Sequence, residues 1–240
     1  MKYLRMKLKN INMNNLLKIG IPSKGRLRKD VLNIFKKKKL KLFSEKGKRD
    51  LVGYISGKKN IKIIYLHARE IIESLGDGSL DIGFSGYDLL RESEQNIQKK
   101  IKIIKKYEFG KANLVIAIPD DWIDVQTIAD LEEIAFEFKD KKKKRLRVST
   151  KYLKLTRDFL YSKGVTQFKI VKSLGSTEVA PFTGTSEIIS DITSTGETLK
   201  ANKLRILKDG QILKSQACLM ISKFSFQKSG IKKIINLLGK

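Results

Sequence analysis

Several features that would point to a particular class of protein are scarce in this 240-residue chain. It has one cysteine, three prolines, and no run of about 18 apolar residues. A single cysteine excludes a disulfide framework and a thiolate metal cluster, so we expect Cys218, in the apolar phrase SQACLMIS, to be a buried structural thiol. The first twenty residues have scattered basic residues instead of a basic head followed by an apolar block. We therefore expect a soluble, cytoplasmic protein without a membrane segment.

Acidic residues are also scarce, with 25 against 51 basic residues and a formal net charge of +26. Such a charge attracts phosphate backbones at long range, which makes nucleic-acid binding one hypothesis. However, lysine supplies 41 of the basic residues, and the runs at residues 36–39 and 139–145 have no interleaved aromatic residues on which bases could stack. We interpret the lysines as a solvated surface and expect no specific nucleic-acid partner.

Apolar periodicity predicts alternating strands and helices along most of the chain. Strands are expected near residues 16–22, 60–66, 80–86 and 101–107, with helices between them, and a second series begins at residues 109–119. Residues 203–222 have the pattern of two strands joined by a turn at Asp209-Gly210. We expect an α/β fold with two lobes of mixed, mainly parallel sheet and flanking helices, joined by two crossings. The expected parts are a basic tail (1–14), lobe I (15–110 plus 205–240) and lobe II (111–204).

The stretch SDITSTGETLKANKL, residues 190–204, is rich in hydroxyl side chains, which favour turns over helix interiors. A strand that ends in Asp191, then a hydroxyl and glycine loop, then a helix start would suit the 5-phosphate of a ribose. Gly196 would let the backbone approach closely, and the Asp191 carboxylate can accept hydrogen bonds from both ribose hydroxyls. An ordinary capped surface helix would also explain Thr195 and Thr198. The predicted phosphoribose-binding residues are Asp191, Thr193, Ser194, Thr195, Gly196, Glu197 and Thr198.

The longer segment EVAPFTGTSEIISDITSTGETL, residues 178–199, resembles without gaps the signature of the ATP phosphoribosyltransferase family. Other segments resemble the same family: IGIPSKGRL, KRDLVGYI, GSLDIGFSGYDLL and RLRVSTKYLKLTRDFL. The resemblance covers residue 16 to about residue 222. Because the chain ends before a C-terminal regulatory domain could begin, we expect it to be similar to the short form of the family.

The resemblance implies a reaction in which N1 of the adenine of ATP is joined to C1 of phosphoribosyl pyrophosphate, with release of pyrophosphate. It also implies Mg²⁺ carried by the substrate phosphates, and a homodimer that assembles with a regulatory subunit resembling a histidyl-tRNA synthetase. We interpret His67 as a structural or rim residue. The site residues that the resemblance implies are Lys24, Arg26 and Arg49 as the cations of catalysis, and Gly86, Asp88, Glu178 and Lys151 near the nucleotide or pyrophosphate.

A second function remains open at this point. Two α/β lobes with two crossings also describe type II periplasmic-binding-protein-like folds, which bind small molecules without chemistry. A cytoplasmic small-anion-binding protein is therefore the alternative to the transferase, and substrate turnover distinguishes the two.

Overall fold

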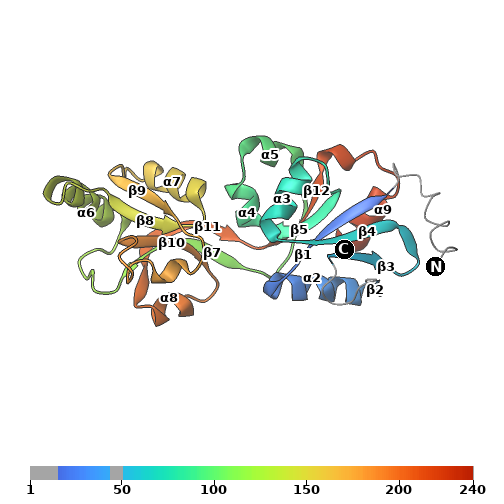
Figure 1. Ribbon diagram of the computed structural model, residues 1–240, viewed down its shortest axis with the longest axis horizontal. Helices are drawn as coiled ribbons and strands as arrows, with labels where there is room; N and C mark the ends of the chain where they lie inside the picture. The colour runs from blue at the N-terminus through green and yellow to red at the C-terminus, as the bar shows by residue number, and fades with distance from the viewer. Residues whose placement is uncertain (1–15, 44–50, 240) are drawn as a thin grey trace. The chain divides into compact units, whose positions relative to one another are not determined.

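The computed structural model describes residues 16–43 and 51–239, which form two compact units. Unit 1 contains the described residues up to Gly110 and those from Gln216 onward, and unit 2 is Lys111–Ser215. Each unit has one sheet with helices on it (Figure 1). The expected basic tail, residues 1–14, lies outside the described residues.

Unit 1 contains a seven-stranded sheet in the order β2-β3-β4-β1-β5-β12-β6. The central strands β4, β1 and β5 are parallel, and the outer strands pair antiparallel. The strand bounds are β1 Leu17–Pro22, β2 Leu42–Phe43, β3 Val52–Ile55, β4 Lys58–Leu66, β5 Ile82–Gly86, β6 Ile101–Lys106 and β12 Ala217–Ser222.

Helices cover both faces of this sheet, as Figure 1 shows. Val31 and Phe35 of α2 pack with Ile234 of α9 against one face, and Ile71 and Leu75 of α3 pack against the other. This coverage explains why the residues of β5 and β12 are buried almost without interruption instead of alternately. The helices are α2 Gly25–Lys37, α3 Ala68–Gly76, α4 Tyr87–Glu92, α5 Gln95–Lys100, the 3₁₀ turn η3 Lys223–Ser225 and α9 Ile231–Gly239.

Unit 2 contains a five-stranded sheet in the order β11-β7-β10-β8-β9. Helices α6 and α7 pack on one face around Leu131 and Leu160, and the short α8 packs on the other face through Leu199. The bounds are β7 Ala112–Pro119, α6 Ile128–Lys141, β8 Leu146–Thr150, α7 Leu153–Ser162, β9 Phe168–Lys172, the 3₁₀ turn η2 Thr177–Val179, β10 Ile188–Thr193, α8 Glu197–Ala201 and β11 Leu204–Ser215.

The fold is α/β with two mixed sheets, as the sequence predicts, but parallel pairing does not prevail. Among the described strands, four neighbouring pairs are parallel and six are antiparallel. The strand-helix alternation indicates parallel neighbours correctly for β4, β1 and β5 of unit 1 and for β10, β8 and β9 of unit 2. It misses the antiparallel pairs for two reasons. β2–β3 and β3–β4 are consecutive strands with no helix between them, and the other antiparallel pairs join strands that are not neighbours in the chain.

The predicted hairpin at Asp209-Gly210 is wrong, and residues 205–215 lie in unit 2 instead of lobe I. Both halves of β11 pair with the same strand, β7, and the Asp209-Gly210 dipeptide lies in the irregular stretch between them. Asp209 Oδ1 accepts a hydrogen bond of 2.8 Å from the Ile128 amide at the start of α6. The turn chemistry of this dipeptide therefore produces a bulge within one strand instead of a reversal of the chain.

Cys218 is fully buried, as expected from the sequence, and burial raises the pKa of its thiol to about 11. The thiol is therefore protonated at neutral pH and is a poor nucleophile. Within the described ranges, every helix is too short or too polar to cross a membrane.

Candidate functional site

The segment from Asp191 to Leu199 forms a strand, a tight turn and a short helix. Strand β10 continues two residues beyond Asp191 to Thr193, and α8 begins at Glu197. Between them, Gly196 has φ +79°, a left-handed conformation that side chains with a Cβ atom disfavour. The Gly196 amide donates a 2.9 Å hydrogen bond to Thr193 Oγ1, which closes the turn. Because α8 has only five residues, the loop itself contributes more polar groups than the helix end does.

This turn borders a cavity of about 280 Å³ in unit 2. A volume of this size is near the lower end of ordinary small-ligand sites. The cavity brings together most of the predicted phosphoribose residues and also Glu178 from η2, whereas Gly196 and Glu197 do not line it. Its lining consists of Glu178, Asp191, Ile192, Thr193, Ser194, Thr195, Thr198 and Leu199.

Asp191 is the most electrostatically perturbed group in this cavity. Burial raises the pKa of its carboxyl, and the nearby charge of Glu178 adds to that rise. The Ile192 amide, 2.8 Å from Asp191 Oδ1, and the ammonium of Lys151 oppose the rise without cancelling it. A partly buried carboxylate with few donors of its own is well suited to accept hydrogen bonds from ligand hydroxyls.

An ion pair at the opposite end of the same strands anchors β10 to β8. Arg147 Nη2 lies 2.6 Å from Glu187 Oε1, and the Arg147 amide donates to Glu187 Oε2 at 2.7 Å. Burial raises the pKa of Glu187, but the hydrogen bonds from Arg147 more than offset it and lower the pKa overall. The two adjacent strands are thereby held in one register.

Two of the predicted cations, Lys24 and Arg26, lie exposed in unit 1 around the turn from β1 to α2. Sequence reasoning missed Arg28, which holds this turn in place. Its Nη1 donates a 2.7 Å hydrogen bond to the Ser23 carbonyl, and its guanidinium lies 4.9 Å from the centre of the Tyr65 ring. The third predicted cation, Arg49, lies outside the described residues.

Gly86 and Asp88 lie at the carboxyl end of β5, where α4 begins, and Asp88 is buried. Since β1 and β5 are parallel neighbours, the Lys24–Arg26 turn and the Gly86–Asp88 turn follow strand ends on the same edge of the sheet. Ligands of open α/β sheets bind at such edges. His67, after β4, caps α3: its Nδ1 accepts from the Arg69 amide at 3.4 Å. This capping role agrees with its interpretation as a structural residue.

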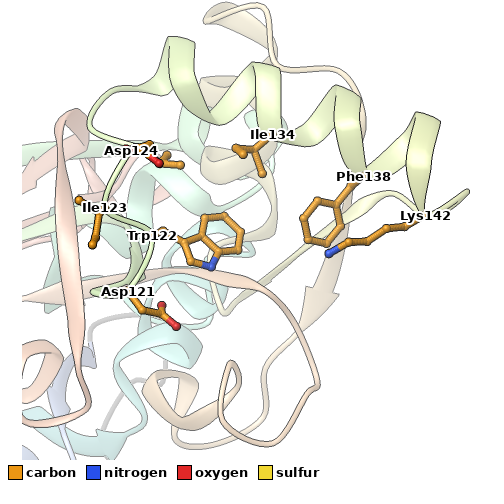
Figure 2. A pocket seen from close by; sticks show the side chains of 8 residues that line it. Asp121, Trp122, Ile123, Asp124, Ile134, Phe138 and Lys142 are labelled. Atoms are coloured by element: carbon orange, nitrogen blue, oxygen red, sulfur yellow. The ribbon is translucent and has the colours of Figure 1, made fainter.

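A second hollow, of about 320 Å³, lies beside α6 in the same unit (Figure 2). Figure 2 shows Trp122 and Phe138 bordering it, and Lys142 Nζ lies 3.8 Å from the centre of the Phe138 ring. Among the described residues, none with a hydroxyl side chain lines this hollow, whereas four hydroxyl side chains line the cavity beside the Asp191 turn and can donate to phosphate oxygens. The hollow beside the Asp191 turn is therefore the better candidate for a phosphorylated ligand.

Comparison with known proteins identifies the family. The family model described as ATP phosphoribosyltransferase matches residues 67–240. The ATP phosphoribosyltransferase of Nitrobacter winogradskyi is 43% identical over 94% of this chain and 70% of its own length. That of Bradyrhizobium sp. (strain ORS 278) is 46% identical, with 88% of this chain and 65% of its own length covered. For Mesorhizobium japonicum the values are 42%, 87% and 90%. The chain thus spans about two thirds of the first two relatives and most of the third.

Solved structures agree on the fold. A chain of the ATP phosphoribosyl transferase (HisG:HisZ) complex from Thermotoga maritima has a TM-score of 0.71 and 27% identity, covering 93% of this chain and 95% of its own. The GluR0 ligand-binding core with L-glutamate has a TM-score of 0.53 at 11% identity, covering 93% and 90%, and shows the fold alone. Because the family model covers well over half of the chain and the curated relatives share more than 40% identity with it, the chain belongs to the ATP phosphoribosyltransferase family, a family of glycosyltransferase-class enzymes.

Proposed function

We propose that this chain joins N1 of the adenine of ATP to C1 of phosphoribosyl pyrophosphate and releases pyrophosphate, the first step of histidine biosynthesis in the cytoplasm. The observation that carries the proposal is the cavity beside the Asp191 turn. Its lining residues are those of the signature segment, in a chain whose relatives have this activity in their name.

In this proposal the turn after Asp191 binds the 5-phosphate, and Asp191 binds the ribose hydroxyls. The hydroxyls of Thr193, Ser194, Thr195 and Thr198 and the amides of the turn, including those of Gly196 and Glu197, supply neutral donors for phosphate oxygens. The Gly196 amide already bonds to Thr193 Oγ1, so a phosphate would compete with that hydroxyl for the donor. Glu178 and Lys151 shift the pKa of the Asp191 carboxyl in opposite directions, and they are the candidates for contacts to the nucleotide.

The departing pyrophosphate gains negative charge during the reaction, so the enzyme must supply cations to it. We assign this role to Lys24, Arg26 and Arg49, and we assign Gly86 and Asp88 to the nucleotide or pyrophosphate contacts. Arginine suits the role because its planar fork binds two phosphate oxygens at once. The exposed positions of Lys24 and Arg26 on a turn that Arg28 holds in place support their availability for a ligand.

We propose that Mg²⁺ enters with the substrate phosphates. Magnesium in nucleotide-type sites commonly takes one or two carboxylates together with phosphate oxygens. In the part of the chain that the structure describes, no cluster of three or more acidic, histidine or cysteine side chains forms a metal site by itself. The bound ion would neutralise charge on the diphosphate.

We also propose that the chain works as the short form of the family, as a homodimer with a regulatory subunit that resembles a histidyl-tRNA synthetase. The T. maritima relative is a HisG:HisZ complex, and this chain covers 95% of the matched chain. The agreement in length with the M. japonicum relative supports the same form.

The experiment that tests the function is turnover by the purified full chain. With ATP, phosphoribosyl pyrophosphate and Mg²⁺, we expect a new ultraviolet-absorbing phosphoribosyl-ATP product, formed in step with pyrophosphate. Asp191→Ala should chiefly raise the KM for phosphoribosyl pyrophosphate. If both substrates bind and are recovered unchanged, with and without the regulatory subunit, the chain is a small-anion-binding protein and the proposal is wrong.

A further inference from the structure

Three buried hydroxyl groups lie directly behind the Asp191 cavity, where apolar side chains would normally pack. Thr150 at the end of β8, Thr156 in α7 and Ser190 in β10 are each fully buried. Burying a hydroxyl is unfavourable unless it is hydrogen-bonded, so we expect these three neighbouring hydroxyls to have hydrogen-bond partners. The three residues come from three different elements: Thr150 and Thr156 lie outside the signature segment, and Ser190 lies within it, one residue before Asp191.

The hydroxyls form a chain of hydrogen bonds centred on Thr156. Thr156 Oγ1 lies 2.9 Å from Ser190 Oγ and 3.4 Å from Thr150 Oγ1. Thr150 Oγ1 in turn accepts a 2.9 Å hydrogen bond from the Tyr152 amide, which shapes the turn around Lys151. A helical threonine commonly bonds to a carbonyl of its own helix. Thr156 Oγ1 instead contacts two hydroxyls of the sheet, so it links α7 to β10 at Ser190 and to β8 at Thr150.

The residues that directly follow Ser190 and Thr150 are charged residues of the candidate site. Ser190 and Thr150 are direct partners in the parallel register of β10 and β8, so Asp191 and Lys151 are the next residues along adjacent strands. Successive side chains of a strand point to opposite faces. Ser190 therefore bonds to α7 on one face while Asp191 turns to the cavity on the other. The contacts that fix Ser190 and Thr150 therefore also fix the positions of Asp191 and Lys151, the next residues in the chain.

We propose that Thr156 is a positioning residue for the phosphoribose site: its hydroxyl, bonded to Ser190 and next to Thr150, fixes β10 at Ser190 and the end of β8, and thereby the placement of Asp191 relative to Lys151. This inference rests on the proposed function for the identity of the ligand. In this proposal Thr156 does not touch the ligand, and its effect passes through Ser190 of β10 and Thr150 of β8.

The test is Thr156→Val, which keeps the shape of the side chain and removes the hydroxyl. Losing one net hydrogen bond from the placement of Asp191 should raise the KM and the Kd for phosphoribosyl pyrophosphate about three- to tenfold, with little change in kcat. Thr156→Ser restores the hydroxyl and should restore the affinity. The matched control is Ser149→Ala: Ser149 is a buried neighbour on β8 whose hydroxyl has no hydrogen-bond partner within the described ranges, so its removal should leave the affinity unchanged.

A pH profile distinguishes positioning from a purely structural role. The charged groups that act on Asp191 are Lys151, which lowers its pKa, and Glu178, which raises it. If the Val variant moves Asp191 away from Lys151, the acidic limb of phosphoribosyl pyrophosphate binding should shift to higher pH. A variant with a lower melting temperature but the parent's Kd and pH profile would show a structural threonine and overturn the inference.

Each outcome can be separated from failure of the proposed function, because calorimetric binding and turnover are measured on the same full chain. A parent that binds phosphoribosyl pyrophosphate without turnover refutes the function, and the ratio of variant to parent Kd still tests Thr156. If Thr156→Val does not fold, Ser190→Ala removes the same bond from its other end and should raise the Kd equally. An unchanged Kd for Ser190→Ala, or a parent that binds no phosphoribosyl pyrophosphate, overturns the inference.

Discussion

Replacing Gly196 with alanine tests whether the turn after Asp191 binds phosphate in the conformation described above. The residue has φ +79° and ψ −3°, and a Cβ atom built there has no atom within 4 Å. The cost of the substitution is therefore conformational and not steric. A left-handed conformation costs a residue with a Cβ atom roughly 1–2 kcal/mol.

That cost must appear either in stability or in ligand affinity. The turn is closed by one hydrogen bond between Gly196 and Thr193 and is followed by a helix of only five residues, so it can relax locally. If it relaxes, the ligand has to restore the original conformation on binding. We then expect the Kd for phosphoribosyl pyrophosphate to rise by about 5- to 30-fold, with little loss of melting temperature.

Gly164→Ala provides a matched control, because Gly164 has φ +86°, also has open space around a built Cβ atom, and lies after α7 outside the cavity lining. Its cost should appear as a melting temperature lowered by about 2–4 °C for each kcal/mol, with unchanged affinity. Calorimetric titration and thermal unfolding of the two variants measure both quantities. Equal affinity of Gly196→Ala and the parent would refute the reasoning about the turn.

Three further predictions concern charged groups. Because burial raises the pKa of Asp191, the parent should lose stability as the pH rises from the ordinary pKa of 3.8 through the raised pKa. Asp191→Asn should therefore have a higher melting temperature than the parent above this pH range and the same melting temperature below it. Arg147→Met should cost about 1 kcal/mol at neutral pH, after discounting for the partial exposure of the pair, and this difference should vanish in thermal melts as the pH falls through the lowered pKa of Glu187. Arg26→Ala should lower kcat by about 10²-fold in steady-state assays, whereas removal of the exposed charge of Lys29 on the same helix should not; equal kcat values would remove Arg26 from the proposed cation set.

The sequence predicts the alternation of strands and helices because most elements here have long, regular apolar patterns. It predicts the cavity lining because the turn residues are contiguous in the chain, so their proximity requires no knowledge of the tertiary structure. Elements that lack such a pattern were missed: β2 has two residues, and α5, Gln95–Lys100, has no buried side chain. Their position depends on the neighbours that they pack against, not on their own periodicity.

Two other features required the structure because they join distant residues. The hydroxyls of Thr150, Thr156 and Ser190 meet only when two strands and a helix are assembled, and each of them alone reads as an ordinary polar residue. The role of Asp209 depends on Ile128, 81 residues away, whose amide it accepts. Without that partner, Asp-Gly between two apolar runs indicates a hairpin.

The pairing of β7 with β11 makes residues 111–215 an inserted domain with adjacent ends. Within unit 2, Ala112 pairs with Ser215 at the end of the β7–β11 pair. Within unit 1, just outside the two unit boundaries, the Ala217 amide donates a 3.1 Å hydrogen bond to the Phe109 carbonyl. The host segment therefore closes across the insertion through its own backbone. A short linker between residues 110 and 216 would leave unit 1 a continuous chain. Residues 111–215 could be expressed separately, which offers a direct route to studying the turn after Asp191 in a fragment less than half the size of the whole chain.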